Sequence, residues 1–352
     1  MARNGTGGIG GPDGPRGTIR AVARQAGVSV STVSNVLNNP AVVAAETRGK
    51  VEAAMAATGY VRNAQARQLR GVPSAIVGVV ILDLANPFYG ELARGVEDAL
   101  DHSGCRLLMA STDASPDKER RQLRTMEEQG VRGVLLTPVA TTGGRLREMA
   151  RHGTRVVLVD HPGGPGMCSV ATDNVTGARL AVDHLLALGH RRIAFLKGSS
   201  KVRAVGDRRL GVVQSLTAAG LDPAEALLEV RLPASGGADA ADAAVGTVLG
   251  HRDPPTAVFC LNDIAALGAV RGLRRRGVRV PADMSVVGYD DVHFADLLDP
   301  GLTTVHQPSY DLGRAAAGLL LDESRASHVH RQVVFRPSLV VRGSTAPPPG
   351  RG

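Results

Sequence analysis

One face of a predicted helix carries four short side chains that could contact the bases of DNA. These are Val30, Ser31, Ser34 and Asn35. Short side chains let a helix lie deep in the DNA major groove, where longer ones would hold its backbone away. The amide of an asparagine such as Asn35 can also form two hydrogen bonds with adenine. A helical hairpin with no nucleic-acid role is the alternative interpretation.

A helix, a glycine turn and a second helix are predicted to present this face. Gly27 ends the first helix, and Ser29 is a natural N-cap for the second. Apolar residues with helical spacing are expected to face inward, at Ile19, Val22, Ala23 and Ala26 in the first helix and at Val33, Val36 and Leu37 in the second. Their burial would turn the short polar side chains toward solvent.

Positive charge is concentrated in the same part of the chain. Residues 1–70 contain nine Lys and Arg residues against three Asp and Glu residues, a net charge of +6 out of the chain's +8. The other 282 residues are nearly neutral, at +2. A basic module attached to a neutral body is typical of a protein that binds a polyanion such as DNA.

The composition argues against a membrane protein, a secreted protein and a metal site. No apolar run approaches the ~18 residues of a membrane span, and the first residues lack the apolar core of a signal peptide. The three cysteines, Cys105, Cys168 and Cys260, are widely spaced, which fits reduced thiols better than disulfides or a zinc site. We therefore expect a cytoplasmic protein that binds no metal.

Motifs for catalysis or cofactor binding are weak. Residues 5–10 match the dinucleotide-binding pattern G-x-G-x-x-G, but only four residues precede them and Gly-Pro-Asp-Gly-Pro follows. That pattern needs a strand before it and a helix after it, so a disordered leader is the favoured interpretation. The chain has no Gly-x-Ser-x-Gly elbow and no Walker loop. We expect no enzyme activity and no cofactor.

Beyond residue 73, short apolar runs alternate with helical stretches. The runs predicted as strands are 75–82, 106–109, 133–136, 155–159, 192–196, 257–261 and 285–289. This alternation predicts a doubly wound α/β body with parallel sheets. Because the strands are too many for one sheet, we expect two lobes with a ligand cleft beyond the strand ends. The polar segments at those ends are Asp83–Tyr89, Asp160, Gly198–Arg208, Asn262–Asp263 and Asp290–Asp291.

The order of residues along the chain resembles that of the lactose/galactose repressor (LacI/GalR) family. In the basic segment the similarity covers Thr18–Asn38, Glu46–Arg48, Gly59–Tyr60 and Asn63–Leu69. In the remainder it covers Asn86–Tyr89, His184–His190, Asn262–Gly268, Pro281–Asp290 and Thr303–Pro308. The resemblance implies an N-terminal all-α helix-turn-helix head and an α/β body of two doubly wound parallel-sheet lobes, similar to periplasmic sugar-binding proteins.

Composition and resemblance together divide the chain into five parts. They are a disordered leader (1–17), a DNA-binding domain (18–62), a hinge helix with its linker (63–73), an effector-binding and dimerisation domain (74–343) and a disordered, Pro/Gly-rich tail (344–352).

The resemblance also implies which residues of the head contact DNA. Val30, Ser31 and Asn35 fall where family members read bases, and Thr32 and Ser34 fall where they touch phosphates. Many relatives have arginine at the position of Asn35, so the half-site of this protein is expected to differ from theirs. Further predicted contacts of the head are Thr18 and Asn38.

In the hinge, the resemblance implies contacts from Asn63, Arg67 and Leu69. Leu69 occupies the position of a leucine that enters the minor groove at the centre of the operator. Arg62 replaces a proline that commonly precedes the hinge helix, which makes the start of this helix less well defined.

Five residues of the body fall at the family's ligand-binding positions: Phe88, Tyr89, Arg208, Asn262 and Asp290. A guanidinium, an amide and a carboxylate together can bind vicinal hydroxyls or the edge of a purine, and an aromatic ring can contact the ligand's face. Two alternatives stay open, a surface position for Arg208 and a helix-capping role for Asp290. Asp263 is expected to cap its helix rather than to bind ligand.

The sequence thus predicts a homodimeric, cytoplasmic transcription regulator, with repression favoured over activation. It would bind a palindromic double-stranded operator, and a small-molecule effector, a sugar or nucleoside-like compound, would alter its affinity for that DNA. Two rival hypotheses are a solute-binding protein of a transport system, disfavoured by the basic head, and an NAD-dependent enzyme, supported only by the glycine-rich leader.

Overall fold

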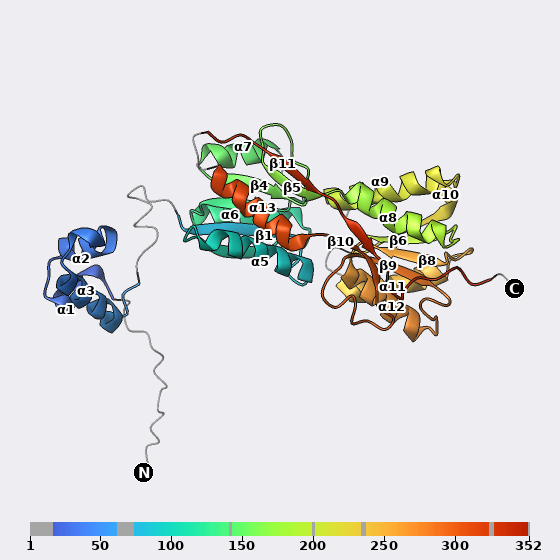
Figure 1. Ribbon diagram of the computed structural model, residues 1–352, viewed down its shortest axis with the longest axis horizontal. Helices are drawn as coiled ribbons and strands as arrows, with labels where there is room; N and C mark the ends of the chain where they lie inside the picture. Colours follow the sequence, from blue (N-terminus) through green and yellow to red (C-terminus); the bar gives the residue numbers. More distant parts are fainter. Residues whose placement is uncertain are drawn as a thin grey trace, which may run out of the picture. The chain divides into compact units, whose positions relative to one another are not determined.

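The computed structural model describes residues 17–61, 74–140, 143–198, 201–233, 237–323 and 327–350. The chain divides into two compact units, residues 1–72 and residues 73–352 (Figure 1). The predicted leader up to residue 16 and the predicted hinge contacts Asn63, Arg67 and Leu69 lie outside the described residues.

The first unit is built from short helices whose ends are fixed by local hydrogen bonds. Its elements are α1 (Ile19–Ala26), α2 (Val30–Asn38), the 3-10 helix η1 (Pro40–Val42) and α3 (Ala45–Thr58). Gly27 ends α1 with a left-handed φ of 66°, which glycine adopts without strain. Ser29 then caps α2, because its Oγ accepts a 3.0 Å hydrogen bond from the backbone N–H of Thr32. The predicted glycine turn and N-cap are confirmed.

The core of this unit is small and apolar. Val22 and Ala23 of α1 pack with Val33 and Val36 of α2 and with Val51 of α3. The inward-facing positions predicted from helical spacing are therefore buried or half-buried. Burial of this stripe leaves the opposite face of α2 in solvent, where the candidate DNA contacts lie.

The second unit contains two six-stranded sheets, and we call the first of them, with its helices, lobe 1 (Figure 1). The strand order of lobe 1 is β11-β5-β4-β3-β1-β2, and all neighbours are parallel. The helices α5 and α13 cover one face of this sheet, and α6 and α7 cover the other. The strands are β1 (Ile76–Ile81), β2 (Arg106–Ser111), β3 (Gly133–Leu136), β4 (Arg155–Val159), β5 (Ser169–Thr172) and β11 (Gln332–Phe335), and the helices are α5 (Pro87–Asp101), α6 (Pro116–Glu128), α7 (Gly143–Arg151) and α13 (Ser309–Asp322).

Lobe 2 repeats this architecture with the strand order β12-β10-β9-β8-β6-β7, in which only β12 is antiparallel. The pair α8 and α9 packs on one side of the sheet and the pair α11 and α12 on the other. The strands are β6 (Ile193–Lys197), β7 (Leu227–Arg231), β8 (Ala257–Cys260), β9 (Ser285–Asp290), β10 (Thr303–His306) and β12 (Ser338–Val340), and the helices are α8 (Asn174–Ala187), α9 (Arg203–Ala218), α10 (Pro223–Ala226), α11 (Gly237–Leu249) and α12 (Asp263–Arg275).

The described chain crosses between the lobes at three places, namely from β5 to α8, from β10 to α13 and from β11 to β12. These crossings explain why both lobes contain strands from distant parts of the sequence (Figure 1). The predicted fold class, a helical head with two parallel-sheet lobes, is confirmed. Strands β5, β7, β10, β11 and β12 were not among the predicted runs.

The start of the predicted disordered tail is wrong, because Ser344 is fully buried. Its Oγ accepts a 2.8 Å hydrogen bond from the N–H of Thr303 and donates one of 2.6 Å to the carbonyl of Val286. Ala346 follows the same course, since its N–H donates to Ser285 Oγ at 3.0 Å. The Pro/Gly-rich composition could not reveal these bonds, because their partners lie about 40 to 60 residues away along the chain.

Among the described residues, no helix is long and apolar enough to cross a membrane.

Candidate DNA-binding helix and ligand-binding cleft

The exposed face of α2 carries the residues predicted to read bases. Val30 is 43% exposed. Ser31 and Asn35 are also exposed. Such a face offers a methyl contact for thymine from Val30 and a bidentate amide for adenine from Asn35.

The remaining predicted contacts of the head take part in local hydrogen bonds. Thr18 caps α1 by accepting from the N–H of Ala21 at 3.2 Å. Thr32 Oγ1 lies 2.8 Å from Ser29 Oγ. Asn38 Nδ2 donates to both the carbonyl and the hydroxyl oxygen of Ser34, at 2.8 and 3.2 Å. Thr18, Thr32 and Asn38 thus stabilise helix ends and turns, and phosphate contacts would be additional to these bonds.

In the second unit, a cavity of about 120 Å³ lies between the two lobes. A cavity of this size holds on the order of ten water molecules or one small ligand. It is lined by all five residues predicted to bind ligand, Phe88, Tyr89, Arg208, Asn262 and Asp290. Phe88 and Tyr89 enter from the first turn of α5 in lobe 1. In lobe 2, Asn262 lies at the start of α12, Asp290 at the end of β9 and Arg208 in the second turn of α9.

Arg208 is buried in this cleft, so the surface alternative is wrong. Its Nε donates a 2.8 Å hydrogen bond to Asn174 Oδ1, and its Nη1 donates to the carbonyl of Leu261. The guanidinium carbon lies 3.6 Å from the ring centroid of Tyr289, a cation–π contact. Arginine has five N–H donors, so these bonds orient the group while leaving donor capacity for a ligand.

Gly211 lets the helix that carries Arg208 lie close to its neighbour. A Cβ atom at this position would lie 2.3 Å from the carbonyl oxygen of Val175, in α8. Only glycine permits this approach of α9 to α8, which brings Arg208 within hydrogen-bond distance of Asn174.

Asp290 is buried at the end of β9 and accepts hydrogen bonds from two amides. Asn86 Nδ2 donates to Oδ2 at 2.9 Å, and Gln307 Nε2 donates to Oδ1 at 2.8 Å. Its φ of 114° is a conformation that non-glycine residues rarely adopt, as is common at binding sites. Burial raises the pKa of Asp290 to about 6, although Arg208 opposes this shift. No helix follows Asp290 directly, so the capping alternative is wrong.

The residue that caps α12 is Asn262 and not Asp263. Asn262 is the N-cap of α12, since its Oδ1 accepts from the N–H of Ala265 at 2.9 Å. The prediction that Asp263 caps the helix is wrong, because its carboxylate accepts instead from Thr304 Oγ1 at 2.6 Å and from the N–H of Val292 at 2.9 Å. Asp263 therefore supports the strand ends that form the cleft, while the Nδ2 of Asn262 remains able to donate to a ligand.

A second buried carboxylate, Asp160, completes the polar lining from lobe 1. It accepts from Asn174 Nδ2 at 3.2 Å, so Asn174 connects Asp160 with Arg208. Burial raises the pKa of Asp160 above its ordinary value, with Arg208 opposing. Burial also raises the pKa of Tyr89 well above its ordinary value, and the two nearby carboxylates add to this shift. The cleft is thus lined by one guanidinium, a neutral phenol and three carboxylates, of which Asp160 and Asp290 are buried and Asp83 is half-buried.

Three residues that organise this site, Asn86, Asn174 and Gln307, were not among the five predicted ligand-binding residues. Asn86 carried a usable signal, since an asparagine before proline at a strand end is a natural helix N-cap. Asn174 and Gln307 lie at two of the crossings between the lobes, and those crossings were not visible in the sequence pattern.

Comparison with known proteins places both units in one family. Residues 18–63 match the model described as bacterial regulatory proteins, lacI family, and residues 182–345 match that of a periplasmic binding protein-like domain. The HTH-type transcriptional regulator DegA of Bacillus subtilis (strain 168) is 35% identical over 337 residues, which are 94% of this chain and 98% of DegA.

Two solved structures are similar along most of their length. The lac repressor dimer bound to operator and the anti-inducer ONPF has a TM-score of 0.78, with 32% identity over 94% of this chain and 99% of that one. A LacI family transcriptional regulator from Enterococcus faecium with bound ribose has a TM-score of 0.71 and 28% identity over 77% of this chain and 99% of that one. The protein therefore belongs to the lacI family of bacterial regulatory proteins, and it is a transcription regulator that binds DNA under the control of a small ligand.

Proposed function

We propose that this protein is a repressor that binds a palindromic operator as a homodimer. A neutral, polyhydroxylated ligand in the cleft changes its affinity for that operator. The observation that carries the ligand assignment is the convergence of Arg208, Asp290 and Asn262 on one cavity, where the first two are buried and Asn262 is half-buried. These groups supply both donors and acceptors, and vicinal hydroxyls or a nucleoside edge need both.

The charge of the cleft favours a neutral ligand over a phosphorylated one. Asp160 and Asp290 are both buried beside the single guanidinium of Arg208. A phosphate group would meet two carboxylates in a medium of low dielectric constant, where like charges repel strongly. The ribose bound to the similar regulator of Enterococcus faecium is a ligand of the neutral class.

The proposed mechanism is a two-state change in lobe closure. Asn86 of lobe 1 bonds to Asp290 of lobe 2, so a ligand that also bonds to Asp290 changes the contacts between the lobes. A ligand shifts such an equilibrium only by its difference in affinity for the two states. Closure would then alter the spacing of the two heads in a dimer, and the similar lac repressor binds its operator as a dimer.

The head supports the assignment of the DNA contacts. Val30, Ser31 and Asn35 would reach base edges, while Thr18, Thr32, Ser34 and Asn38 would lie along the backbone of the duplex. The hinge contacts Asn63, Arg67 and Leu69 stay predictions. Since its DNA target lies in the cytoplasm of a bacterium, we place the protein there.

A ligand screen followed by DNA binding tests this proposal. Thermal-shift measurements with free sugars, nucleosides and sugar phosphates should identify a neutral ligand, because a ligand at about 100 times its Kd stabilises a protein by roughly 2.7 kcal/mol. The same ligand should change the affinity for the protein's own upstream DNA in a gel shift. A transport receptor would bind ligand with no effect on DNA, and stabilisation by sugar phosphates alone would contradict the neutral class.

A further inference from the structure

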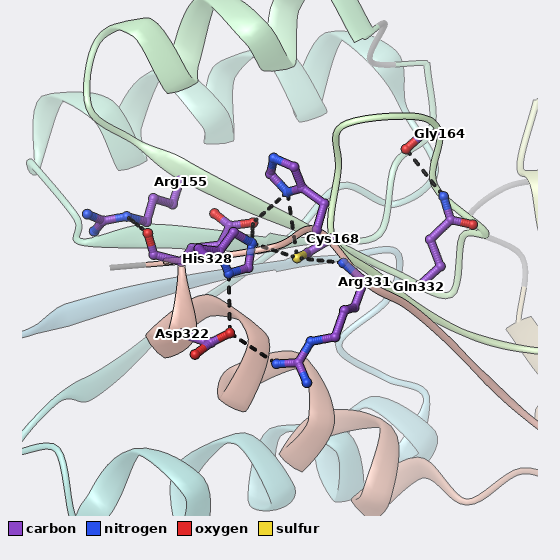
Figure 2. Close-up of polar contacts among 9 residues, drawn as sticks. Arg155, Gly164, Cys168, Asp322, His328, Arg331 and Gln332 are labelled. Carbon is purple, nitrogen blue, oxygen red and sulfur yellow. Dashed lines mark hydrogen bonds and ion pairs between the residues drawn. The ribbon is translucent and has the colours of Figure 1, made fainter. Parts of the chain in front are cut away.

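Four side chains of metal-binding type converge at the edge of the lobe 1 sheet opposite the cleft. The cleft lies at the carboxyl ends of the strands, whereas Cys168 comes just before the start of β5. Its sulfur faces His328 (Figure 2). The set comprises Cys168, Glu323, His328 and His330, and one ligand atom from each lies within 4.8 Å of all the others.

Strand pairing brings these residues together from distant parts of the chain. Strand β11 pairs in parallel with β5, with Ser169 opposite Gln332, so the residues that precede the two strands are also neighbours. Glu323 follows the last residue of α13 directly. The cluster therefore joins the start of β5, the end of α13 and the segment that leads into β11.

The distances between the ligand atoms fit one tetrahedral ion. Cys168 Sγ lies 3.3 Å from His328 Nε2 and 3.8 Å from His330 Nδ1. Glu323 Oε1 lies 4.0 Å from the same His328 nitrogen and 3.9 Å from that of His330. Zinc bonds of about 2.3 Å to sulfur and about 2.0–2.1 Å to nitrogen and oxygen put tetrahedral ligand atoms about 3.3–3.6 Å apart. The four distances exceed these values by at most about 0.7 Å, and the atoms of the other two pairs lie within 4.8 Å of each other, so the side chains would move closer together to hold the ion.

Neighbouring groups orient the ligands toward this centre (Figure 2). His328 Nδ1 lies 3.3 Å from Asp322 Oδ2, and Arg331 Nη2 donates to the same oxygen at 3.0 Å. A carboxylate at Nδ1 holds the imidazole proton there and leaves the lone pair of Nε2 directed at Cys168, as in many zinc sites. The backbone N–H of Arg331 also donates to Cys168 Sγ at 3.5 Å, a bond that supports a thiolate.

An ion would have a path into the site. The side chain of His330 is 47% exposed, and a surface cavity lined by Glu323 and His330 adjoins the cluster. Thiolate and imidazole ligands select zinc and similar ions over magnesium and calcium, which prefer oxygen alone. Four protein ligands leave no open position, which is typical of a structural zinc site rather than a catalytic one.

We propose that Cys168, Glu323, His328 and His330 bind one zinc ion, which fastens the end of α13 to the starts of β5 and β11. The ion lies apart from the ligand cleft and acts on the stability of lobe 1. Binding in the folded state alone stabilises a protein by mass action, so zinc raises the unfolding temperature of the second unit and a chelator lowers it.

Cobalt substitution in the untagged full-length protein tests this site, since a histidine tag would itself bind metal. The protein is stripped with chelator and titrated with cobalt(II), followed by competition with zinc. We expect one equivalent of cobalt per chain, intense visible bands of a tetrahedral complex and a thiolate-to-metal charge-transfer band, all displaced by one equivalent of zinc.

Paired variants assign the ligands. Cys168→Ser should abolish the charge-transfer band, whereas Cys105→Ser, a second buried cysteine, should leave it unchanged. His330→Ala should weaken cobalt binding at least tenfold. Because the side chain of His330 is half exposed, we expect this variant to fold. The exposed His102→Ala is its control. Asp322→Asn should keep the spectrum but weaken cobalt binding by about ten- to a hundredfold, as expected of a positioning residue.

Three results would overturn the proposal. The first is a weak octahedral spectrum without a charge-transfer band. The second is binding only at millimolar metal that Cys168→Ser and His330→Ala do not alter, which would indicate an adventitious ion only. The third is that the zinc-loaded and the chelator-stripped wild-type proteins unfold at the same temperature.

Discussion

Asn86 Nδ2 donates a 2.9 Å hydrogen bond to Asp290 Oδ2, which joins the first turn of α5 in lobe 1 to the end of β9 in lobe 2. Both residues are buried in the cleft. The carboxylate also accepts from Gln307, which lies at a crossing between the lobes. Asp290 is therefore the point at which ligand binding and the relative position of the lobes can influence each other.

Loss of the cleft's charged groups should remove the ligand response and spare DNA binding. Arg208→Ala and Asp290→Asn should each weaken ligand binding by about 5- to 150-fold, because an unpaired buried polar group costs roughly 1–3 kcal/mol. Calorimetry measures the ligand affinity and a gel shift the DNA affinity. Arg209→Ala is the matched control, since Arg209 is the next residue of α9 but half exposed and paired with Glu229. Undiminished ligand affinity in both cleft variants would move the site elsewhere.

Replacement of Asn35 should change which base is read. The exposed amide of Asn35 is suited to adenine, so Asn35→Ala should relax one base position in each half-site, at a cost of about 1–3 kcal/mol for the preferred base. Selection from randomised sites with the purified protein measures this preference. An identical base preference in the variant and the wild type would exclude a base-reading role, and Arg209→Ala serves again as a control that should alter nothing.

The stability of the second unit should depend on pH through Asp263. Burial, with the nearby charge of Asp290 in second place, raises the pKa of Asp263 from 3.8 to about 8. An acid whose pKa is higher in the folded than in the unfolded state takes up a proton on folding. Its contribution to stability is therefore complete below about pH 4 and is lost as the pH rises through about 8.

Urea unfolding across this pH range, with and without Asp263→Asn, measures the effect. An asparagine can accept from the N–H of Val292 and donate to Thr304 Oγ1, which preserves both contacts of Asp263. The variant should fold and lose much of the decrease in stability between about pH 4 and pH 8. An equal decrease in both proteins would show that another group titrates.

Leu69 supplies a prediction about the hinge, which lies outside the described residues. If each leucine of a dimer is buried between base pairs, Leu69→Ala should remove roughly 1.5–3 kcal/mol of operator binding per subunit. The bend of the DNA should be lost with it, while folding and ligand binding stay unchanged. Circular permutation gels report the bend, and a variant that binds and bends its operator like the wild type would contradict the hinge mechanism.

Local features of the fold were predictable from sequence, and long-range ones were not. The turn at Gly27 and the cap at Ser29 depend on neighbouring residues only. Strand β1 is a continuous apolar run, whereas β5 has the sequence Ser-Val-Ala-Thr and is buried by its position in the sheet rather than by its composition. No local pattern distinguishes such a strand from a loop.

The two polar clusters of the body show the same division. Arg208 and Asp290 could be predicted because both fall at ligand-binding positions that the resemblance to the family implies. Asn174 could not, because its contact with Arg208 depends on the crossing from β5 to α8. Cys168 was assigned no chemistry for the same reason, since its neighbour His328 is 160 residues away and comes close only through the pairing of β5 with β11.

Reciprocal coupling between ligand and operator is the most direct test of the account. Thermodynamic linkage requires that the factor by which the ligand changes DNA affinity equals the factor by which DNA changes ligand affinity. Fluorescence anisotropy gives the first factor, and calorimetry with and without saturating operator duplex gives the second. We predict equal factors in the wild type, and in Arg208→Ala a smaller effect of the ligand on DNA affinity at concentrations that just saturate the wild type. A ligand that binds the wild-type cleft while both factors remain one would contradict the account.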